Sequence, residues 1–253
     1  MFNNYVEVYE NFYRIRRLGA NRLPGDGGPF GFDIHAAIMV DYAIRKFSCD
    51  AIIETGCFAG DTTEYLVRKY PDLTVISCDI VEDYQSFTKE RVSFAKNATV
   101  LHGSSNDIVR EYANKFKFPF LYLDAHWYEY WPIDDEISSV DSGILCIDDF
   151  DIKNGRYGFD VYKGRTCGPE ILRPFSDKIK KFYTNNPEAT MPFPCLQPAR
   201  RSGRAFVPVG KFKDFFAESQ MFLQHSIDEI AERANGVSFE TNTQPVRQRS
   251  ERT

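Results

Sequence analysis

The sequence predicts an α/β fold in which helices cover both faces of a central, mostly parallel sheet of about seven strands. Three observations support this prediction. Short β-rich segments alternate with helical segments between residues 51 and 148. The intervals between these strands are long enough for right-handed crossover helices. Two further strand-like segments, near residues 190–196 and 204–209, are separated by a turn and predict an antiparallel hairpin at the sheet edge.

We interpret residues 1–233 as one domain. Its first part, residues 1–47, is predicted to be a cap. An aromatic and basic stretch with helical spacing is followed there by a Pro- and Gly-rich loop over residues 24–31. Asp33 then has the position of an N-cap for a helix over residues 34–47.

Residues 48–210 form the predicted core. We expect strands at 51–54, 73–79, 98–102, 120–124 and 144–148, joined by helices near 62–69, 84–95, 105–115 and 133–140. The pattern is less regular after residue 148. We expect there a polar loop over 151–168, a helix over 169–183, the edge hairpin, a helical segment over 211–233 and a flexible, Arg-rich tail over 234–253.

The composition narrows the classes of partner. Of the 253 residues, 43% are hydrophobic and 26% are charged, which is typical of a globular protein with a substantial core. The formal net charge of −5 gives no general attraction for nucleic acid or for an anionic membrane. Basic residues do gather within 200–204 and 247–252, and we interpret these segments as a solvated loop and a polar tail.

The cysteines and the N-terminus indicate a cytoplasmic protein. The six cysteines are scattered without a CxxC pair, which is typical of reduced thiols in a core. Residues 1–5 lack the basic start of a signal peptide, and no stretch approaches the roughly 18 apolar residues that a membrane span needs. The sequence leaves the oligomeric state open between a monomer and a homo-oligomer.

A glycine-containing loop follows the first predicted strand, at Glu54–Gly60. Gly56 and Gly60 have no Cβ, so the backbone can approach a bound adenosine closely. The Glu-x-Gly-x-x-x-Gly spacing differs from the Gly-x-Gly-x-x-Gly of pyrophosphate-binding loops. The Glu54 carboxylate would also repel a pyrophosphate, whereas it tolerates a sulfonium. The loop therefore favours S-adenosylmethionine (SAM) over NAD.

Asp79 ends the second predicted strand, about 20 residues beyond the loop, where a carboxylate can accept hydrogen bonds from ribose hydroxyls. NAD sites use the same device, so Asp79 alone does not discriminate between the two cofactors. A purely structural interpretation stays open, in which Gly56 and Gly60 make a tight turn and Asp79 caps the following helix.

The segment Glu54–Gly60, with Asp79 and Asp124, resembles the successive motifs of class I SAM-dependent methyltransferases over about residues 35–210. This resemblance implies a Rossmann-like fold, SAM as cofactor, and a position for Ser104 against the adenine. The predicted SAM site comprises Glu54, Gly56, Cys57, Phe58, Gly60, Thr62, Asp79, Ser104 and Asp124.

Acidic residues follow the fourth and fifth predicted strands. Asp124 ends one strand, and Asp148 and Asp149 end the other. The ends of neighbouring parallel strands converge on one crevice, where several carboxylates repel one another unless a proton or a cation neutralises them. Mg²⁺ or a similar divalent cation prefers such oxygen ligands. We therefore predict a metal site at Asp124, Asp148 and Asp149, although Asp149 could instead cap the next turn.

His126 lies two residues beyond Asp124, and its near-neutral imidazole makes it a candidate general base. A structural or metal-binding role is the alternative. With a metal that lowers the pKa of a substrate hydroxyl, Asp124 and His126 would support O-methylation. The segments 124–126 and 147–150 resemble those of metal-dependent sugar O-methyltransferases of the macrocin and mycinamicin type. This implies a small-molecule or sugar acceptor.

Two other functions stay open. The basic segments 200–204 and 247–252 would suit a nucleic-acid-modifying methyltransferase, which the net charge disfavours. A non-catalytic SAM- or nucleotide-binding module is the second alternative. The aromatic residues after His126 either wall the acceptor pocket or pack as core; they are Trp127, Tyr128, Tyr130 and Trp131.

Overall fold

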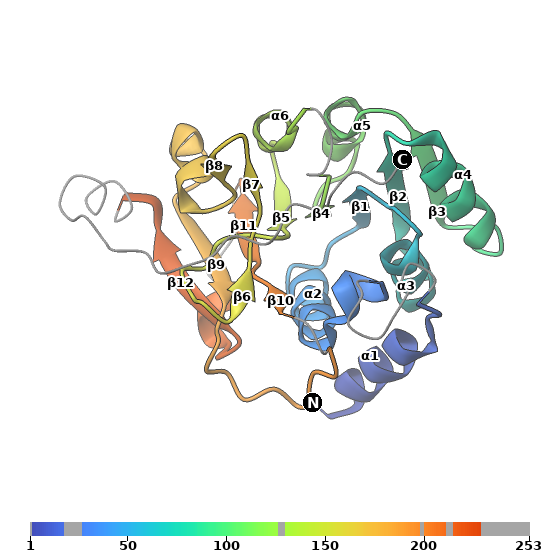
Figure 1. The fold of residues 1–253 in the computed structure, drawn as a ribbon, viewed down its shortest axis with the longest axis horizontal. Helices are drawn as coiled ribbons and strands as arrows, with labels where there is room; N and C mark the ends of the chain where they lie inside the picture. The colour runs from blue at the N-terminus through green and yellow to red at the C-terminus, as the bar shows by residue number, and fades with distance from the viewer. Residues whose placement is uncertain (1, 18–26, 126–129, 198–199, 211–214, 229–253) are drawn as a thin grey trace.

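The computed structural model describes the chain except residues 1, 18–26, 126–129, 198–199, 211–214 and 229–253. Its main sheet has eight strands in the order β12-β9-β11-β5-β4-β1-β2-β3 (Figure 1). The strands are β1 Ala51–Thr55, β2 Thr74–Asp79, β3 Ala98–His102, β4 Pro119–Leu123, β5 Gly143–Ile147, β9 Lys181–Asn185, β11 Ala205–Val209 and β12 Phe222–Ser226. Strands β1 to β5 are parallel, whereas β11 is antiparallel to both of its neighbours. The predicted mostly parallel α/β fold is confirmed.

Helices lie on both faces of this sheet, with α5 and α6 on the opposite side from α1, α2 and α3 (Figure 1). Their bounds are α1 Phe2–Arg14, α2 Ile34–Lys46, α3 Asp61–Lys69, α4 Glu82–Arg91, α5 Ser105–Tyr112 and α6 Ile133–Ser139. Short 3₁₀ helices are η1 Pro29–Phe32, η2 Ala113–Lys115, η3 Pro169–Phe175 and η4 Phe215–Glu218. Two small two-stranded sheets pair β6 Tyr157–Gly158 with β10 Arg201–Ser202, and β7 Val161–Tyr162 with β8 Arg165–Thr166.

Successive side chains of the parallel strands enter two different cores, because strand side chains alternate between faces. Ile52 and Phe120 pack in the core that contains α1, α2 and α3. The next residues along the same strands, Ile53 and Leu121, pack in the core that contains α5, α6 and η3. All four side chains are fully buried. Burial on both faces explains why these strands are nearly continuous apolar runs.

The predictions after residue 148 were partly wrong. The expected helix over 169–183 is a 3₁₀ helix that ends at Phe175, and β9 then occupies Lys181–Asn185. Residues 190–196 form no strand, because Pro192 and Pro194 lack the N–H that a sheet ladder needs. The strand predicted near residue 205 is present as β11, but it lies inside the sheet between β5 and β9.

The described part of the expected helical segment 211–233 also differs from the prediction. It contains η4 and then the edge strand β12, which pairs with β9. Aromatic packing favours this arrangement, because Phe222 lies against Phe206 and Phe216 with ring centroids 5.1 and 4.8 Å apart. The six cysteines form no disulfide, and five of them are buried. Among the described residues, no helix is both long and apolar enough to cross a membrane.

Candidate functional site

The strand order changes direction between the adjacent strands β1 and β4. From β1 the chain adds β2 and β3 on one side and then returns to add β4 and β5 on the other. The connections therefore leave adjacent strands on opposite faces of the sheet, which is where open α/β sheets bind ligands. The glycine loop, Asp79 and the acids after β4 and β5 all follow strands at this edge.

The glycine loop requires both of its glycines. Gly56 has a φ of +77°, and a Cβ on it would lie 2.6 Å from the backbone oxygen of Asp124. Gly60 has a φ of +71°, and a Cβ there would lie 2.8 Å from Oγ1 of Thr88. The N–H groups of Gly56 and Cys57 both donate to the carbonyl of Cys78, each at 3.0 Å. The loop thus joins the ends of β1, β2 and β4.

Asp79 holds the loop in place with its side chain. Its Oδ2 accepts a hydrogen bond of 2.9 Å from the Phe58 N–H, and its Oδ1 accepts one of 2.9 Å from the Val81 N–H. Val81 is the N-cap residue of α4, and no described side chain caps this helix, so Asp79 orients the start of α4 without capping it. Each carboxylate oxygen keeps a second lone pair, so Asp79 can still accept hydrogen bonds from a ligand.

Glu54 lies beneath the loop and is 1% exposed. Its Oε2 accepts hydrogen bonds from Oγ of Ser77, at 2.6 Å, and from Oγ1 of Thr63. Burial raises the pKa of Glu54 to about 7, although both hydrogen bonds favour the ionised form. The neighbouring Cys57 is also buried, and burial raises the pKa of its thiol. Glu54 therefore binds α3 and β2, and its contact with a cofactor stays a prediction.

The other predicted cofactor residues lie around the same loop. Thr62, in the first turn of α3, accepts a hydrogen bond of 3.0 Å from the Phe30 N–H. Ser104 is the N-cap residue of α5, and its hydroxyl bonds to the side chain of Asn106. The Gly103 N–H before it donates to the carbonyl of Asp79 at 3.0 Å. This bond brings the segment that contains Ser104 to the end of β2.

Two exposed apolar side chains lie beside Asp79: Phe58, which is among the predicted cofactor residues, and Ile80, which the sequence analysis missed. Phe58 is 43% exposed and packs edge-on against Tyr84, with ring centroids 4.8 Å apart. Ile80, directly after Asp79, is 44% exposed. Their position next to a hydrogen-bonding carboxylate gives them the capacity to contact a planar ring. An apolar residue directly after the acid of β2 was the available signal.

Three carboxylates converge at the ends of β4 and β5, as predicted. Asp124, Asp148 and Asp149 each offer one oxygen, and these oxygens lie within 4.8 Å of one another. Burial raises the pKa of Asp124 well above its usual range, and the charges of Asp148, Asp149 and Asp160 raise it further. Asp149 adopts a φ of +47°, and Ser202 donates a hydrogen bond to its Oδ1. Such hard oxygen donors with surplus negative charge fit a divalent cation.

Arg204 supplies a positive charge to this site that the sequence analysis missed. Its Nε lies 2.7 Å from Oδ1 of Asp148, and its Nη1 lies 3.2 Å from Oδ2 of Asp33. Tyr122 donates a hydrogen bond of 2.7 Å to the other oxygen of Asp148. Arg204 is only 3% exposed, so the interpretation of residues 200–204 as a solvated loop is wrong for this residue. Arg204 therefore places one positive charge directly beside the carboxylates of Asp148 and Asp33.

Four of the predicted site and pocket residues are not seen at the site. His126, Trp127 and Tyr128 lie outside the described residues, as does the basic segment 247–252. Trp131 is 7% exposed and packs against Tyr162, so it belongs to the core.

Comparisons with known proteins find solved structures that are similar to this chain at low sequence identity. No family model and no curated protein matches the chain. A SAM-dependent methyltransferase from Aquifex aeolicus is 16% identical, with 67% of this chain and 89% of that chain covered and a TM-score of 0.44. The N-methyltransferase NodS from Bradyrhizobium japonicum is 11% identical, with coverages of 70% and 94% and a TM-score of 0.46. An rRNA methylase from Streptococcus thermophilus is 11% identical, with coverages of 70% and 96% and a TM-score of 0.43.

Proposed function

We propose that this protein is a SAM-dependent methyltransferase that methylates a hydroxyl group of a small-molecule or sugar acceptor. The observation that carries the proposal is the close approach of Gly56 to the end of β4. A Cβ on Gly56 would lie 2.6 Å from the backbone carbonyl oxygen of Asp124. This contact joins the glycine loop to the acidic cluster at the point where the strand connections change side. A cofactor bound on the loop would therefore lie beside the carboxylates.

The residues around the loop suit each part of SAM. Asp79 has a free lone pair on each oxygen for the ribose hydroxyls. Phe58 and Ile80 offer exposed apolar surface for the adenine. The cluster of three carboxylates would favour a positively charged sulfonium, whereas it would disfavour a pyrophosphate. SAM supplies a methyl group on a positively charged sulfur.

The acidic cluster would assist the acceptor. Asp124, Asp148 and Asp149 would hold Mg²⁺ or another divalent cation, which lowers the pKa of a bound hydroxyl. We assign the role of general base to His126 because it follows Asp124 by two residues and an imidazole accepts a proton near neutral pH. The ion pair with Arg204 holds the carboxylate of Asp148 in place.

Calorimetry with SAM on the whole chain tests the cofactor part of the proposal. We expect saturable binding, and we expect Asp79→Asn to weaken it by about tenfold or more, because a neutral amide is a poorer acceptor for ribose hydroxyls. Asp83→Asn is the matched control, since Asp83 is exposed in the first turn of α4. Absence of binding at millimolar SAM would overturn the proposal and favour a module without this cofactor.

A methyl-transfer assay with labelled SAM tests the metal and the base. Hydroxylated acceptors are incubated with EDTA, and Mg²⁺ is then added back. We expect EDTA, Asp124→Asn and His126→Ala each to lower the rate by about a hundredfold or more, and Asp107→Asn, an exposed control on α5, to leave it unchanged. Full activity in EDTA and in both variants would refute the metal-and-base assistance without removing the methyltransferase. Activity on RNA alone would favour the nucleic-acid alternative.

A further inference from the structure

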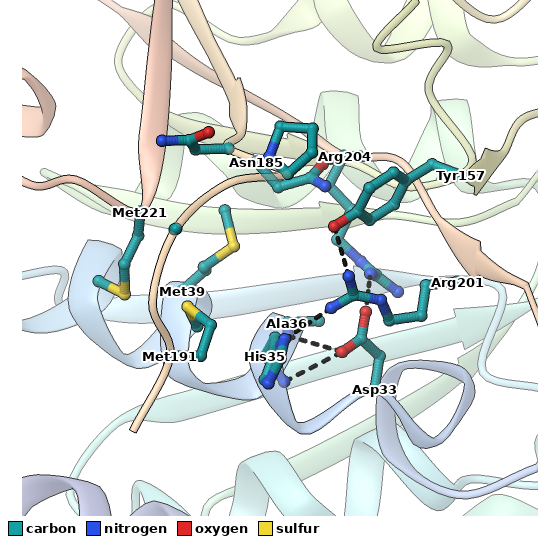
Figure 2. Close-up of a pocket in the computed structure, with 13 residues that line it drawn as sticks. Asp33, His35, Ala36, Met39, Tyr157, Asn185, Met191, Arg201, Arg204 and Met221 are labelled. Carbon is teal, nitrogen blue, oxygen red and sulfur yellow. Dashed lines mark hydrogen bonds and ion pairs between the residues drawn. The ribbon is translucent and has the colours of Figure 1, made fainter. Parts of the chain in front are cut away.

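A pocket lies at the N-terminus of α2, and Arg204, which also contacts Asp148 of the acidic cluster, is among the residues that line it (Figure 2). Its walls come from the N-terminus of α2, from Tyr157 of β6, from residues 185–191 and from Arg201. Its volume of about 50 Å³ is enough for a few water molecules or for one small charged group. A whole sugar or nucleobase is too large for it.

Arg201 is the charged group of this pocket that has no carboxylate partner. One of its terminal nitrogens donates a hydrogen bond of 2.6 Å to Nδ1 of His35, and the other donates one of 2.5 Å to the Tyr157 hydroxyl. The guanidinium also lies over the Tyr157 ring, 4.8 Å from its centroid. Within the described part of the chain, no Asp or Glu forms an ion pair with Arg201. Its remaining N–H groups are available to a ligand.

His35 positions Arg201 without neutralising it. An arginine can only donate, so Nδ1 of His35 is an acceptor and carries no proton. The proton is therefore on Nε2, which donates a hydrogen bond of 2.7 Å to the carbonyl of Phe193. Neither of the two side chains that hold the guanidinium is a carboxylate. Among the described residues, therefore, no Asp or Glu compensates the positive charge of Arg201.

The carboxylate of Asp33 also lines the pocket but is already engaged. It accepts hydrogen bonds from the N–H groups of His35 and Ala36 at the N-terminus of α2, and it lies 3.2 Å from Arg204. Its charge is therefore balanced from the other side. The remaining wall is largely apolar and adaptable, since the side chains of three methionines lie together there (Figure 2); they are Met39, Met191 and Met221.

We propose that this pocket binds the carboxylate or phosphate group of an organic ligand, with Arg201 as the residue that contacts the anion. An anionic oxygen would accept hydrogen bonds from the remaining N–H groups of Arg201 and would balance the positive charge of its guanidinium. The methionine wall would contact the carbon skeleton next to the charged group.

The position of the pocket gives the anion a role in the proposed reaction. Arg204 lines the pocket and also contacts Asp148 in the acidic cluster, so one side chain separates the two places. This step rests on the proposed function: an acceptor held at Arg201 by its anionic group would present its hydroxyl toward Asp124. The acceptor class is then a small hydroxylated acid or a phosphorylated sugar.

Anion binding is measured on the whole chain with malonate and with inorganic phosphate, at constant ionic strength set with chloride. Calorimetry gives the affinity, and the unfolding midpoint gives an independent measure of binding. We expect saturable binding of at least one of the two anions, and the preference between them identifies a carboxylate or a phosphate ligand. We expect Arg201→Gln to weaken this binding by about tenfold or more. Arg200→Gln is the matched control, since Arg200 is the exposed preceding residue, and it should leave the affinity unchanged.

Two results would overturn the proposal. One is equal anion affinity in the wild type, Arg201→Gln and Arg200→Gln; the other is stabilisation by chloride equal to that by malonate and phosphate. If Arg201→Gln is misfolded by circular dichroism, Arg201→Lys decides: it keeps the charge but loses the two-pronged contact, so weaker binding supports the proposal and wild-type affinity refutes it.

SAM affinity, measured in the same samples, separates this proposal from the proposed function. We expect Arg201→Gln to leave SAM affinity unchanged and to raise the KM for an anionic acceptor with little change in kcat. If SAM fails to bind to any variant, the methyltransferase proposal fails, while anion binding at Arg201 stands or falls on its own measurement.

Discussion

Replacing Glu54 with glutamine is expected to remove a specific pH dependence from the stability of this protein. Burial raises the pKa of Glu54 from 4.5 to about 7. Between pH 4.5 and pH 7, therefore, Glu54 is protonated in the folded chain and ionised in the unfolded chain. Because the native state then binds more protons, the free energy of unfolding falls as the pH rises from about 4.5 to about 7. The loss is complete above that range, and it amounts to about 3 kcal/mol.

Glutamine resembles the protonated carboxyl and can accept the same hydrogen bonds from Ser77 and Thr63. The stability of Glu54→Gln relative to the wild type should therefore rise by about 3 kcal/mol between pH 5 and pH 8. Urea unfolding followed by circular dichroism at the two pH values measures this difference. Glu82→Gln, at an exposed position of α4, should show no such change. An equal effect of Glu54→Gln at both pH values would refute the assignment of this proton to Glu54.

Three further predictions concern the same edge of the sheet. Gly56→Ala should lower the free energy of unfolding by at least about 2 kcal/mol, because residue 56 has a positive φ and the added Cβ would clash with the backbone of Asp124. Wild-type stability in urea would contradict this prediction. Arg204→Met should lower the free energy of unfolding by about 3 to 5 kcal/mol, because it leaves buried carboxylates unpaired. Adding Asp148→Asn should recover part of this loss, and strictly additive losses in the double variant would argue against the pairing. Phe58→Ala should weaken SAM binding by about tenfold with little change in stability, because the ring is 43% exposed, and unchanged calorimetric affinity would remove it from the adenine site.

The parallel part of the fold could be predicted because its signals are local. Strands β1 to β4 are short runs that are each followed by a helix, and the observed bounds of β1 to β5 agree with the expected ones within about two residues. The later strands depend on partners that are distant in the sequence. The predicted helix 169–183 includes the first three residues of β9, which is a strand only because it pairs with β11 and β12. Proline gave a usable local signal against a strand at 190–196.

Local sequence signals also predict one part of the candidate site, whereas the other part depends on contacts between residues that are distant in the sequence. Gly56, Asp79 and Asp124 could be recognised because each directly follows a strand, and strand ends of one parallel sheet lie at one edge. Arg204 could not be recognised, since its ion pair with Asp33 joins residues 171 positions apart. Its burial follows from the place of β11 inside the sheet, which no local pattern indicates. The net charge likewise says nothing about which arginines face solvent.

The internal position of β11 also governs the order in which this chain can be assembled during synthesis. Strands β9 and β12 reach the sheet only through β11, which pairs directly with β5. A ribosome therefore releases the first five strands well before their edge can be covered, and the β5 edge stays open to other chains until residue 209 has emerged. We therefore expect chains that stop before β11 to aggregate more readily than the whole chain.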